Sequence, residues 1–287
     1  MDDDTILYRI TSLEGFLSLV LNRQERFVRP IDCWEDTFEG YMLHLLDSDE
    51  GIQRIIGQLY EISGKDIEAT IHNFAKMQRS RYACYGICWT RLRDSDAMWR
   101  IYSYDKKAIQ IVSSKKRISE MLELASLDKK TFEIKTVSYD IEDEQSAINR
   151  ILNRSSPVDA AYFHKRPAFK HEEEVRVLIH DVKMYRNAEE FSVQAIKAKY
   201  QNTDISKSPT KRLYDAISAG KTREEYLKLG GKERMISIND LDSYISGIRV
   251  HPQAPKWYVE VIEKLCAEFK LSFEGKSDLY RAVVKKE

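Results

Sequence analysis

The stretch KHEEEVRVLIHD, residues 170–181, places three consecutive glutamates directly before an apolar run. As a β-strand it would point alternate side chains toward opposite faces of a sheet. One face would carry Glu173 with the two valines and the isoleucine, and this face can lie on a hydrophobic core. The other face would carry Glu172, Glu174 and Arg176. This charged row is either a solvated strand face or part of an active site.

The whole chain has the composition of a globular protein. Its 287 residues can bury a sizeable core, and 43% hydrophobic with 32% charged residues exclude an intrinsically disordered chain. The 46 basic and 46 acidic residues balance, so no overall field favours nucleic acid or a membrane as partner. The apolar runs fall far short of the roughly 20 residues that span a bilayer, and the first residues are acidic where a signal peptide would be basic. We therefore expect a cytoplasmic protein with no membrane partner.

The cysteines and histidines indicate no metal site. The four cysteines contain no CxxC pair, and Cys84 and Cys88 would share one face of an expected strand, as small buried residues do. The six histidines form no HExxH or similar ligand motif. We predict that the protein holds no structural metal.

Strand and helix patterns are mixed along the chain without a regular βαβ alternation. This predicts an α+β fold with a mixed, mainly antiparallel central sheet flanked by helices. We expect a single domain over residues 1–287, with a core at 5–185 and 244–287 and a polar helical insertion at about 186–243. Strands are expected at residues 6–10, 26–30, 82–90, 106–112, 131–140, 170–181, 246–252 and 279–284. Helices are expected after a capping box at Thr11 and Glu14, within 41–80, and at 116–126, 142–154 and 255–269.

Three further clusters are more organised than folding requires. They are Leu7–Arg9, Asp36–Gly40 and Met98–Tyr102. Each also has an ordinary explanation: a core strand with one arginine whose stem lies on apolar surface, a polar turn anchored by an aromatic residue, and a packed aromatic stripe.

Together with the charged row, these clusters resemble a bacterial family of unknown function. Members of that family open with an L-Y-[KR] motif, continue with a D-P-F-E-G-like loop, and carry M-W-x-x-Y and [WF]-x-x-E-x-E-x-R further along. The likeness extends over residues 5–180, and weakly over the closing GIRVHPQA and DLYRAVV segments. The corresponding segments here are Leu7–Arg9, Asp36–Gly40 with Thr37 in place of the proline, Met98–Tyr102 and Phe169–Arg176.

The order of these motifs is similar, more distantly, to that of ADP-ribosyltransferases, including the DNA-modifying DarT-like toxins. In those enzymes a short first strand bears Tyr-His or an arginine, and a later strand carries a glutamate, often within E-x-E. The resemblance implies an ADP-ribosyltransferase-like core in which Arg9 takes the first position and Glu174, or Glu172, the last. The middle position falls on Thr90 or Tyr102. It also implies an NAD-consuming transferase or glycohydrolase with a role as a toxin or in phage defence.

The chemistry of such an enzyme assigns a task to each predicted residue. Glu174 would stabilise the oxocarbenium-like transition state that forms as nicotinamide leaves the ribose of NAD. Glu172 would orient or deprotonate the acceptor, and Arg9 and Arg29 would bind the pyrophosphate. The other predicted contacts with NAD are Tyr8, Thr90, Trp99 and Tyr102.

Other readings of the charged row stay open. Arg176 shares its face with Glu174 and could form a structural salt bridge with it. The chain could be a non-catalytic nucleotide- or protein-binding regulatory module. It fits a metal-dependent nuclease less well, because ExExR lacks the lysine of the D…[DE]xK pattern. Neither the acceptor, which could be protein, nucleic acid, a small molecule or water, nor the oligomeric state follows from the sequence.

The transferase reading makes one spatial demand. Tyr8, Arg9, Trp99, Glu172 and Glu174 must line one cleft, although they come from distant parts of the chain. Arg9 on the opposite side of the sheet from Glu174 would count against this reading.

Overall fold

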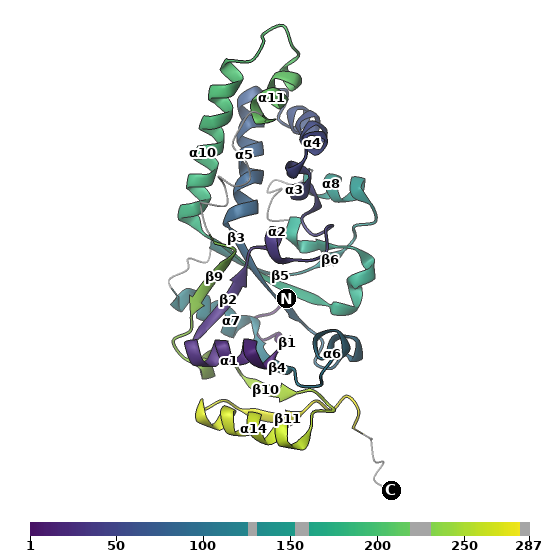
Figure 1. Ribbon diagram of the computed structural model, residues 1–287, viewed down its shortest axis with the longest axis vertical. Coiled ribbons are helices and arrows are strands. Elements are labelled where there is room, and N and C mark those ends of the chain that lie inside the picture. The colour runs from purple at the N-terminus through teal and green to yellow at the C-terminus, as the bar shows by residue number, and fades with distance from the viewer. Residues whose placement is uncertain (126–130, 153–160, 219–230, 282–287) are drawn as a thin grey trace.

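The main sheet of the computed structural model contains nine strands within the residues that the structure describes, 1–125, 131–152, 161–218 and 231–281 (Figure 1). They are β1 (Ile6–Thr11), β2 (Gln24–Val28), β3 (Cys84–Thr90), β4 (Ile109–Ser114), β5 (Phe132–Thr136), β8 (Glu174–His180), β9 (Glu233–Ser237), β10 (Gly247–Val250) and β11 (Phe273–Lys276). Their order is β11-β10-β4-β1-β3-β2-β9, and β8 pairs with β3 and β5. Within the described part of this sheet only β10 and β11 pair in parallel, so the predicted mixed, mainly antiparallel sheet is confirmed.

Helices flank this sheet. Figure 1 shows α4, α5, α10 and α11 as a column beyond one end of the sheet, and α14 beside β10 and β11 at the other end. The longer helices are α1 (Leu13–Asn22), α4 (Asp49–Ile62), α5 (Ile67–Ala83), α6 (Asp96–Tyr102), α7 (Lys115–Leu124), α8 (Glu144–Leu152), α10 (Val182–Gln201), α11 (Pro209–Ser218) and α14 (Lys256–Glu268). The shorter elements are α2 (Pro30–Cys33), α3 (Tyr41–His44), α13 (Leu241–Tyr244), the 3-10 helices η1 (Leu45–Asp47), η3 (Ala161–Phe163) and η4 (Pro167–Glu172), and the two-stranded sheet of β6 (Ser138–Tyr139) and β7 (His164–Lys165). No helix within the described ranges has the length and apolar character needed to cross a membrane.

Strand β3 is the branch point of the sheet. One of its edges pairs with β8 along its whole length, from Cys84 opposite His180 to Thr90 opposite Glu174. Its other edge is shared, because β1 pairs at Thr90 and β2 pairs at Gly86. The first, third and eighth strands of the chain therefore lie side by side near Thr90.

Alternate residues of β8 lie in two different hydrophobic clusters. Val175, Val177 and Ile179 are buried in the first cluster, together with apolar side chains of α1, α7, α13 and α14. Leu178 is buried in the second cluster, together with side chains of α3, α4, α5, α10 and α11. The predicted alternation is thus confirmed from Glu174 onward, but both faces of the strand are covered.

The segment from 186 to 243 contributes to both clusters. Val193 of α10 and Leu213 of α11 are buried against the helical column, and Ile236 of β9 is buried in the first cluster. β9 pairs with β2 at the edge of the main sheet. The tract is polar on average, yet it carries apolar side chains at helical spacing that are buried in both clusters. The helical piece expected near LKLGG falls mainly at 219–230, outside the described residues.

Three other local expectations need correction. The strand predicted over 170–181 begins only at Glu174, because η4 precedes it and Glu173 adopts a left-handed backbone with φ of 40°. The side chain that caps α1 is Ser12 rather than Thr11, since its hydroxyl accepts from the backbone N–H of Gly15 at 3.1 Å. Residues 279–281 form a turn instead of a strand, and 282–284 lie outside the described residues.

Candidate functional site

Five charged side chains meet where η4 leads into β8. We call Glu39, Lys165, Glu172, Glu174 and Arg176 the charged cluster. They come from the loop before α3, from β7, from the end of η4 and from β8. Their side chains are 6%, 8%, 13%, 5% and 1% exposed in that order, so Glu172 is the most accessible.

Arg176 is the most buried member, and all three nitrogens of its guanidinium donate hydrogen bonds. Its Nε lies 2.6 Å from Oε1 of Glu174, and its Nη2 donates to Glu174 Oε2 at 3.0 Å and to Glu39 Oε2 at 2.8 Å. Its Nη1 donates to the carbonyl of Tyr162. The guanidinium also lies over the ring of Trp34 at 4.0 Å from the ring centre. Charge-assisted hydrogen bonds and a cation–π contact therefore fix Arg176 in one position.

Lys165 joins the three carboxylates. Its Nζ lies 2.8 Å from Glu39, 2.6 Å from Glu172 and 3.1 Å from Glu174. An ammonium group has three protons to donate, so these contacts use all of them. Three carboxylates and two cations leave the charged cluster with a formal charge of −1 when every group is ionised.

Backbone contacts hold the two glutamates of the ExE pair. The hydroxyl of Thr90 donates to the carbonyl of Glu172 at 2.5 Å and accepts from the N–H of Leu92 at 3.0 Å. The N–H of Glu174 donates to the hydroxyl of Tyr139 at 2.7 Å. Thr90, proposed for a middle catalytic position, therefore has its hydroxyl occupied in positioning Glu172.

The carboxyls of Glu39 and Glu174 differ in proton affinity. Burial raises the pKa of Glu39, and the nearby Arg176 and Lys165 offset this only in part. Burial also acts to raise the pKa of Glu174, but the charge and hydrogen bonds of Arg176, with Lys165, outweigh it and lower that pKa to about 2. The opposing carboxylates in turn raise the pKa of Lys165 despite its burial. Glu174 is thus held ionised, which suits an electrostatic stabiliser and excludes it as a proton donor near neutral pH.

Tyr102 and Cys88 border the charged cluster. Tyr102 is 49% exposed, while desolvation of its hydroxyl and the nearby Glu172 raise its pKa to about 12. Cys88 lies opposite Arg176 on β3, and its half-buried thiol hydrogen-bonds Glu174. Burial raises the pKa of this thiol well above its usual value, so it is a neutral neighbour and not a thiolate.

A row of three side chains crosses the sheet at this site. Tyr8 on β1 lies opposite Thr90 on β3, and Thr90 lies opposite Glu174 on β8. Residues directly opposite each other in antiparallel strands point to the same face. Trp99 of α6, which packs near β1, is fully buried with its ring 5.3 Å from that of His251. Trp99 therefore supports α6 rather than lining an open surface.

Arg9 does not belong to this site. Because Tyr8 faces the side of Glu174, Arg9 faces the opposite side, where its guanidinium lies 5.1 Å from the centre of the Trp89 ring. There it donates to both oxygens of Glu25, at 2.9 and 2.7 Å, and Glu25 also accepts from Tyr244. The prediction that Arg9 and Glu174 line one cleft is wrong, since adjacent residues of a strand point to opposite faces.

Arg29 is also separate from the charged cluster. It is fully buried just after β2, 3.2 Å from Asp32, with its guanidinium 5.7 Å from the ring centres of Tyr82 and Tyr85. Tyr85 is on the face of β3 opposite to that of Thr90, five residues away. The predicted role of Arg29 beside Arg9 in binding pyrophosphate at the site of Glu174 is therefore not retained.

The structure adds two residues that sequence reasoning did not assign to the site. Glu39 is the glutamate of the DTFEG segment, a motif whose sequence alone indicates no chemical role. Lys165 precedes the FxxExExR motif and lies on β7, which pairs with β6, and its Nζ is 3.1 Å from Glu174. No rule of sequence spacing connects this lysine with the acidic motif that follows it. Among the described residues, no three His, Cys, Asp or Glu side chains are arranged as a metal site.

Comparison with known proteins gives one match. Neither the curated proteins nor the solved structures include a match to this chain. The matching family model covers the chain from within α6 to within β8, and so includes Tyr102, Lys165, Glu172, Glu174 and Arg176 but neither Tyr8 nor Glu39. The resemblance to a family of unknown function is thus confirmed for this part of the chain: residues 98–177 match the family described as "Protein of unknown function (DUF2971)".

Proposed function

We propose that the protein is an NAD-consuming enzyme of the ADP-ribosyltransferase type that cleaves the bond between nicotinamide and ribose at the charged cluster. The observation that carries this proposal is the row of Tyr8, Thr90 and Glu174 on one face of three adjacent strands. A strand-one aromatic residue, a central-strand threonine and a glutamate of an ExE pair occur there in the order that the resemblance implies, and the Thr90 hydroxyl acts by holding the backbone of Glu172. Tyr8 takes the first position in place of Arg9.

In this proposal Glu174 stabilises positive charge on the ribose. Its low pKa keeps the carboxylate ionised, and Arg176 and Lys165 hold it at distances of 2.6 to 3.1 Å. A fixed carboxylate gains most when charge develops, so it favours the transition state over the bound substrate. Arg176 and Lys165 also neutralise part of the negative charge of Glu174. The substrate must therefore displace Lys165 from Glu174, or share this contact, when it binds.

Glu172 and Tyr102 form the accessible side of the proposed site. Glu172 is bound by Lys165 at 2.6 Å and has the largest exposed fraction in the charged cluster. The half-exposed ring of Tyr102 offers a flat surface for nicotinamide. Glu172 is therefore the residue that we assign to orienting the acceptor nucleophile.

The pyrophosphate needs cations other than Arg9 and Arg29. Arg166 follows Lys165 and pairs with Asp36 at 2.8 Å, and Arg91 follows Thr90 and pairs with Glu173 at 3.4 Å; their side chains are 39% and 48% exposed. Arg166 also lies 5.3 Å from the centre of the Phe169 ring. Each guanidinium has more N–H donors than its carboxylate partner uses, and we assign the pyrophosphate to them.

A second candidate function is a non-catalytic binding module. One observation favours it: the members of the charged cluster satisfy each other, as a structural network does. In that case a ligand would bind without being changed. This candidate and the first differ in turnover, not in binding.

The deciding experiment incubates the purified protein with NAD, with and without cell lysate, and follows nicotinamide release by mass spectrometry. The proposal expects nicotinamide release that depends on Glu174, with Glu174→Gln inactive and still folded. NAD binding without nicotinamide release under both conditions would favour the binding module. If the protein neither binds NAD nor releases nicotinamide, both candidates are overturned.

A further inference from the structure

Tyr139 of β6 holds its hydroxyl beside Glu174. The N–H of Glu174 donates to this hydroxyl at 2.7 Å, and the N–H of Val137 donates to the carbonyl of Glu174 at 3.0 Å. The segment from Val137 to Tyr139 therefore runs alongside Glu174 and binds both of its backbone polar groups. Tyr139 is itself partly exposed, so a ligand at the charged cluster can reach it.

The side chain of Tyr139 lies on the same face of the small sheet as that of Lys165. The two residues are partners in the parallel pair of β6 and β7, and paired residues of neighbouring strands point to one face. The Nζ of Lys165 lies 2.6 Å from Glu172 and 3.1 Å from Glu174. Both carboxylates also act electrostatically on the phenol of Tyr139. The hydroxyl of Tyr139 is therefore a neighbour of the carboxylate of Glu174 as well as a partner of its backbone.

The proton of this hydroxyl has no acceptor among the described residues. A phenol carries one proton to donate and also accepts through its lone pairs, and the N–H of Glu174 uses only a lone pair. Burial raises the pKa of Tyr139 to about 12, so the group keeps its proton at neutral pH. Glu174 is ionised and can only accept. The two side chains together offer a ligand one donor and one acceptor side by side.

A donor beside an acceptor matches a cis-diol, in which two adjacent hydroxyls each donate and accept. The ribose next to nicotinamide carries such a diol at its 2′ and 3′ carbons. The 2′ hydroxyl is next to the carbon on which positive charge develops, so a carboxylate gains most by binding there. We propose that Glu174 and Tyr139 hold this diol together: the 2′ hydroxyl donates to Glu174 where Lys165 is displaced or shared, and the 3′ oxygen accepts from the hydroxyl of Tyr139.

This assignment rests on the proposed function and makes Tyr139 a specificity-determining residue. A site that hydrogen-bonds a substrate hydroxyl discriminates against the analogue that lacks it, because the donor of the site is then left unpaired. Tyr139 also has a structural part, since removing its hydroxyl takes away the partner of the Glu174 N–H. The loss of activity in a single variant would not separate these two parts, so the substrate must be varied together with the residue.

The test combines Tyr139→Phe with an NAD analogue that lacks the 3′ hydroxyl of the nicotinamide ribose. Binding to the full chain is measured by isothermal titration calorimetry, and nicotinamide release by mass spectrometry, for both proteins with both ligands. In the wild type, removal of the 3′ hydroxyl should weaken binding by about 10-fold, the scale of one hydrogen bond. In Tyr139→Phe the two ligands should bind equally, because the donor is already gone. A purely structural tyrosine would weaken both ligands alike and keep the difference between them.

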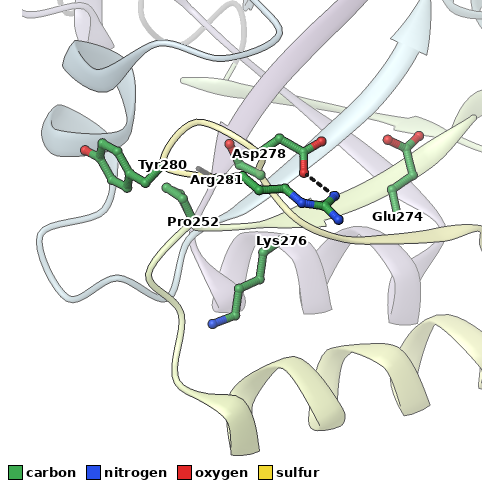
Figure 2. A pocket seen from close by; sticks show the side chains of 7 residues that line it. Pro252, Glu274, Lys276, Asp278, Tyr280 and Arg281 are labelled. Carbon is green, nitrogen blue, oxygen red and sulfur yellow. Dashed lines mark hydrogen bonds and ion pairs between the residues drawn. The ribbon is translucent and has the colours of Figure 1, made fainter. Parts of the chain in front are cut away.

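Tyr280→Phe is the matched control, because it also deletes a phenol hydroxyl that makes a hydrogen bond. The hydroxyl of Tyr280 donates to Asp96, and its side chain lines the cavity beside β10 and β11 (Figure 2). Strands β10, β4, β1 and β3 separate β11 from β8, which carries Glu174. This variant should distinguish the two ligands as the wild type does.

The outcomes separate this assignment from the proposed function. If the wild type binds and cleaves both ligands equally well, or if Tyr139→Phe still prefers NAD by about 10-fold, the diol contact of Tyr139 is overturned and the proposed function stands. The first of these results needs no variant, so it decides even where Tyr139→Phe fails to fold. If the wild type neither binds NAD nor releases nicotinamide, the proposed function is overturned and this assignment with it.

Discussion

Glu174 and Arg176 are two residues apart on β8 and form a paired contact, with Nε to Oε1 at 2.6 Å and Nη2 to Oε2 at 3.0 Å. Strand alternation puts both side chains on one face, and burial removes the water that would screen them. A structural salt bridge and a fixed catalytic carboxylate both require this geometry. The two roles differ in what happens when the charge of Glu174 alone is removed.

Glu174→Gln should lower nicotinamide release at least ~100-fold, the usual scale for losing one electrostatic stabiliser of a transition state. The substitution changes the formal charge of the cluster from −1 to zero and keeps an acceptor for Arg176. The free energy of unfolding should therefore fall by only about 1–3 kcal/mol, measured by urea denaturation. Glu173→Gln is the control for folding, because Glu173 is 45% exposed and lies outside the cluster. Unfolding of Glu174→Gln, with Glu173→Gln intact, would assign the pair a structural role alone.

The stability of the protein should fall steeply in acid because of Glu174. Its pKa is about 2 in the folded protein against an ordinary value of 4.5, so its contribution is present above pH 4.5 and is lost as the pH falls toward 2. The lost contribution amounts to about 3 kcal/mol. Glu39 acts in the opposite sense, because its raised pKa gives a contribution that is present at low pH and lost as the pH rises. Urea denaturation across this window should show a shallower acid loss for Glu174→Gln than for the wild type. Equal slopes would contradict the assignment.

Gly86→Ala should displace Trp34, whose ring packs against the guanidinium of Arg176. A Cβ at Gly86 would lie 2.8 Å from both Leu178 Cδ2 and Trp34 Cζ2, and the Trp34 ring lies under the guanidinium of Arg176. Crowding of this kind in a packed core costs about 1–3 kcal/mol of unfolding free energy.

Gly57→Ala is the matched control for that change, because Gly57 is inside α4 and nothing lies within 4 Å of its added Cβ. It should raise the unfolding free energy by up to about 1 kcal/mol through helix propensity. Thermal or urea unfolding of the two variants side by side decides the point. A Gly86→Ala protein as stable as Gly57→Ala would show that Trp34 is free to move.

Arg9→Met separates a structural arginine from a catalytic one. Removing Arg9 leaves Glu25 buried with Tyr244 as its one side-chain partner among the described residues, so the free energy of unfolding should fall by about 3 kcal/mol. Nicotinamide release per folded molecule should match the wild type, because Arg9 faces away from Glu174. If circular dichroism shows that the variant is folded and its turnover is lost, Arg9 takes part in the reaction after all.

The sequence predicts the alternation of β8 well because its apolar and charged residues differ at every second position. It does not mark where the strand begins, and so Glu172 and Glu173 are assigned to a strand that starts only at Glu174. Nor does an adjacent pair such as Tyr8 and Arg9 reveal which member faces the site, because that depends on the register of β1 with β3. Lys165 reaches the cluster through a tertiary contact that no local pattern encodes.

The branching of the sheet at β3 has a consequence for how the molecule opens. Trp89 and Val175 belong to the first hydrophobic cluster, while Cys84 and Leu178 belong to the second, so one antiparallel ladder is shared by both. Neither cluster can lose its packing without exposing one side of that ladder. The sheet and the helical column should therefore unfold together as one cooperative unit. The charged cluster lies at the end of this ladder, and its geometry should persist until global unfolding, which favours preorganised binding over induced assembly.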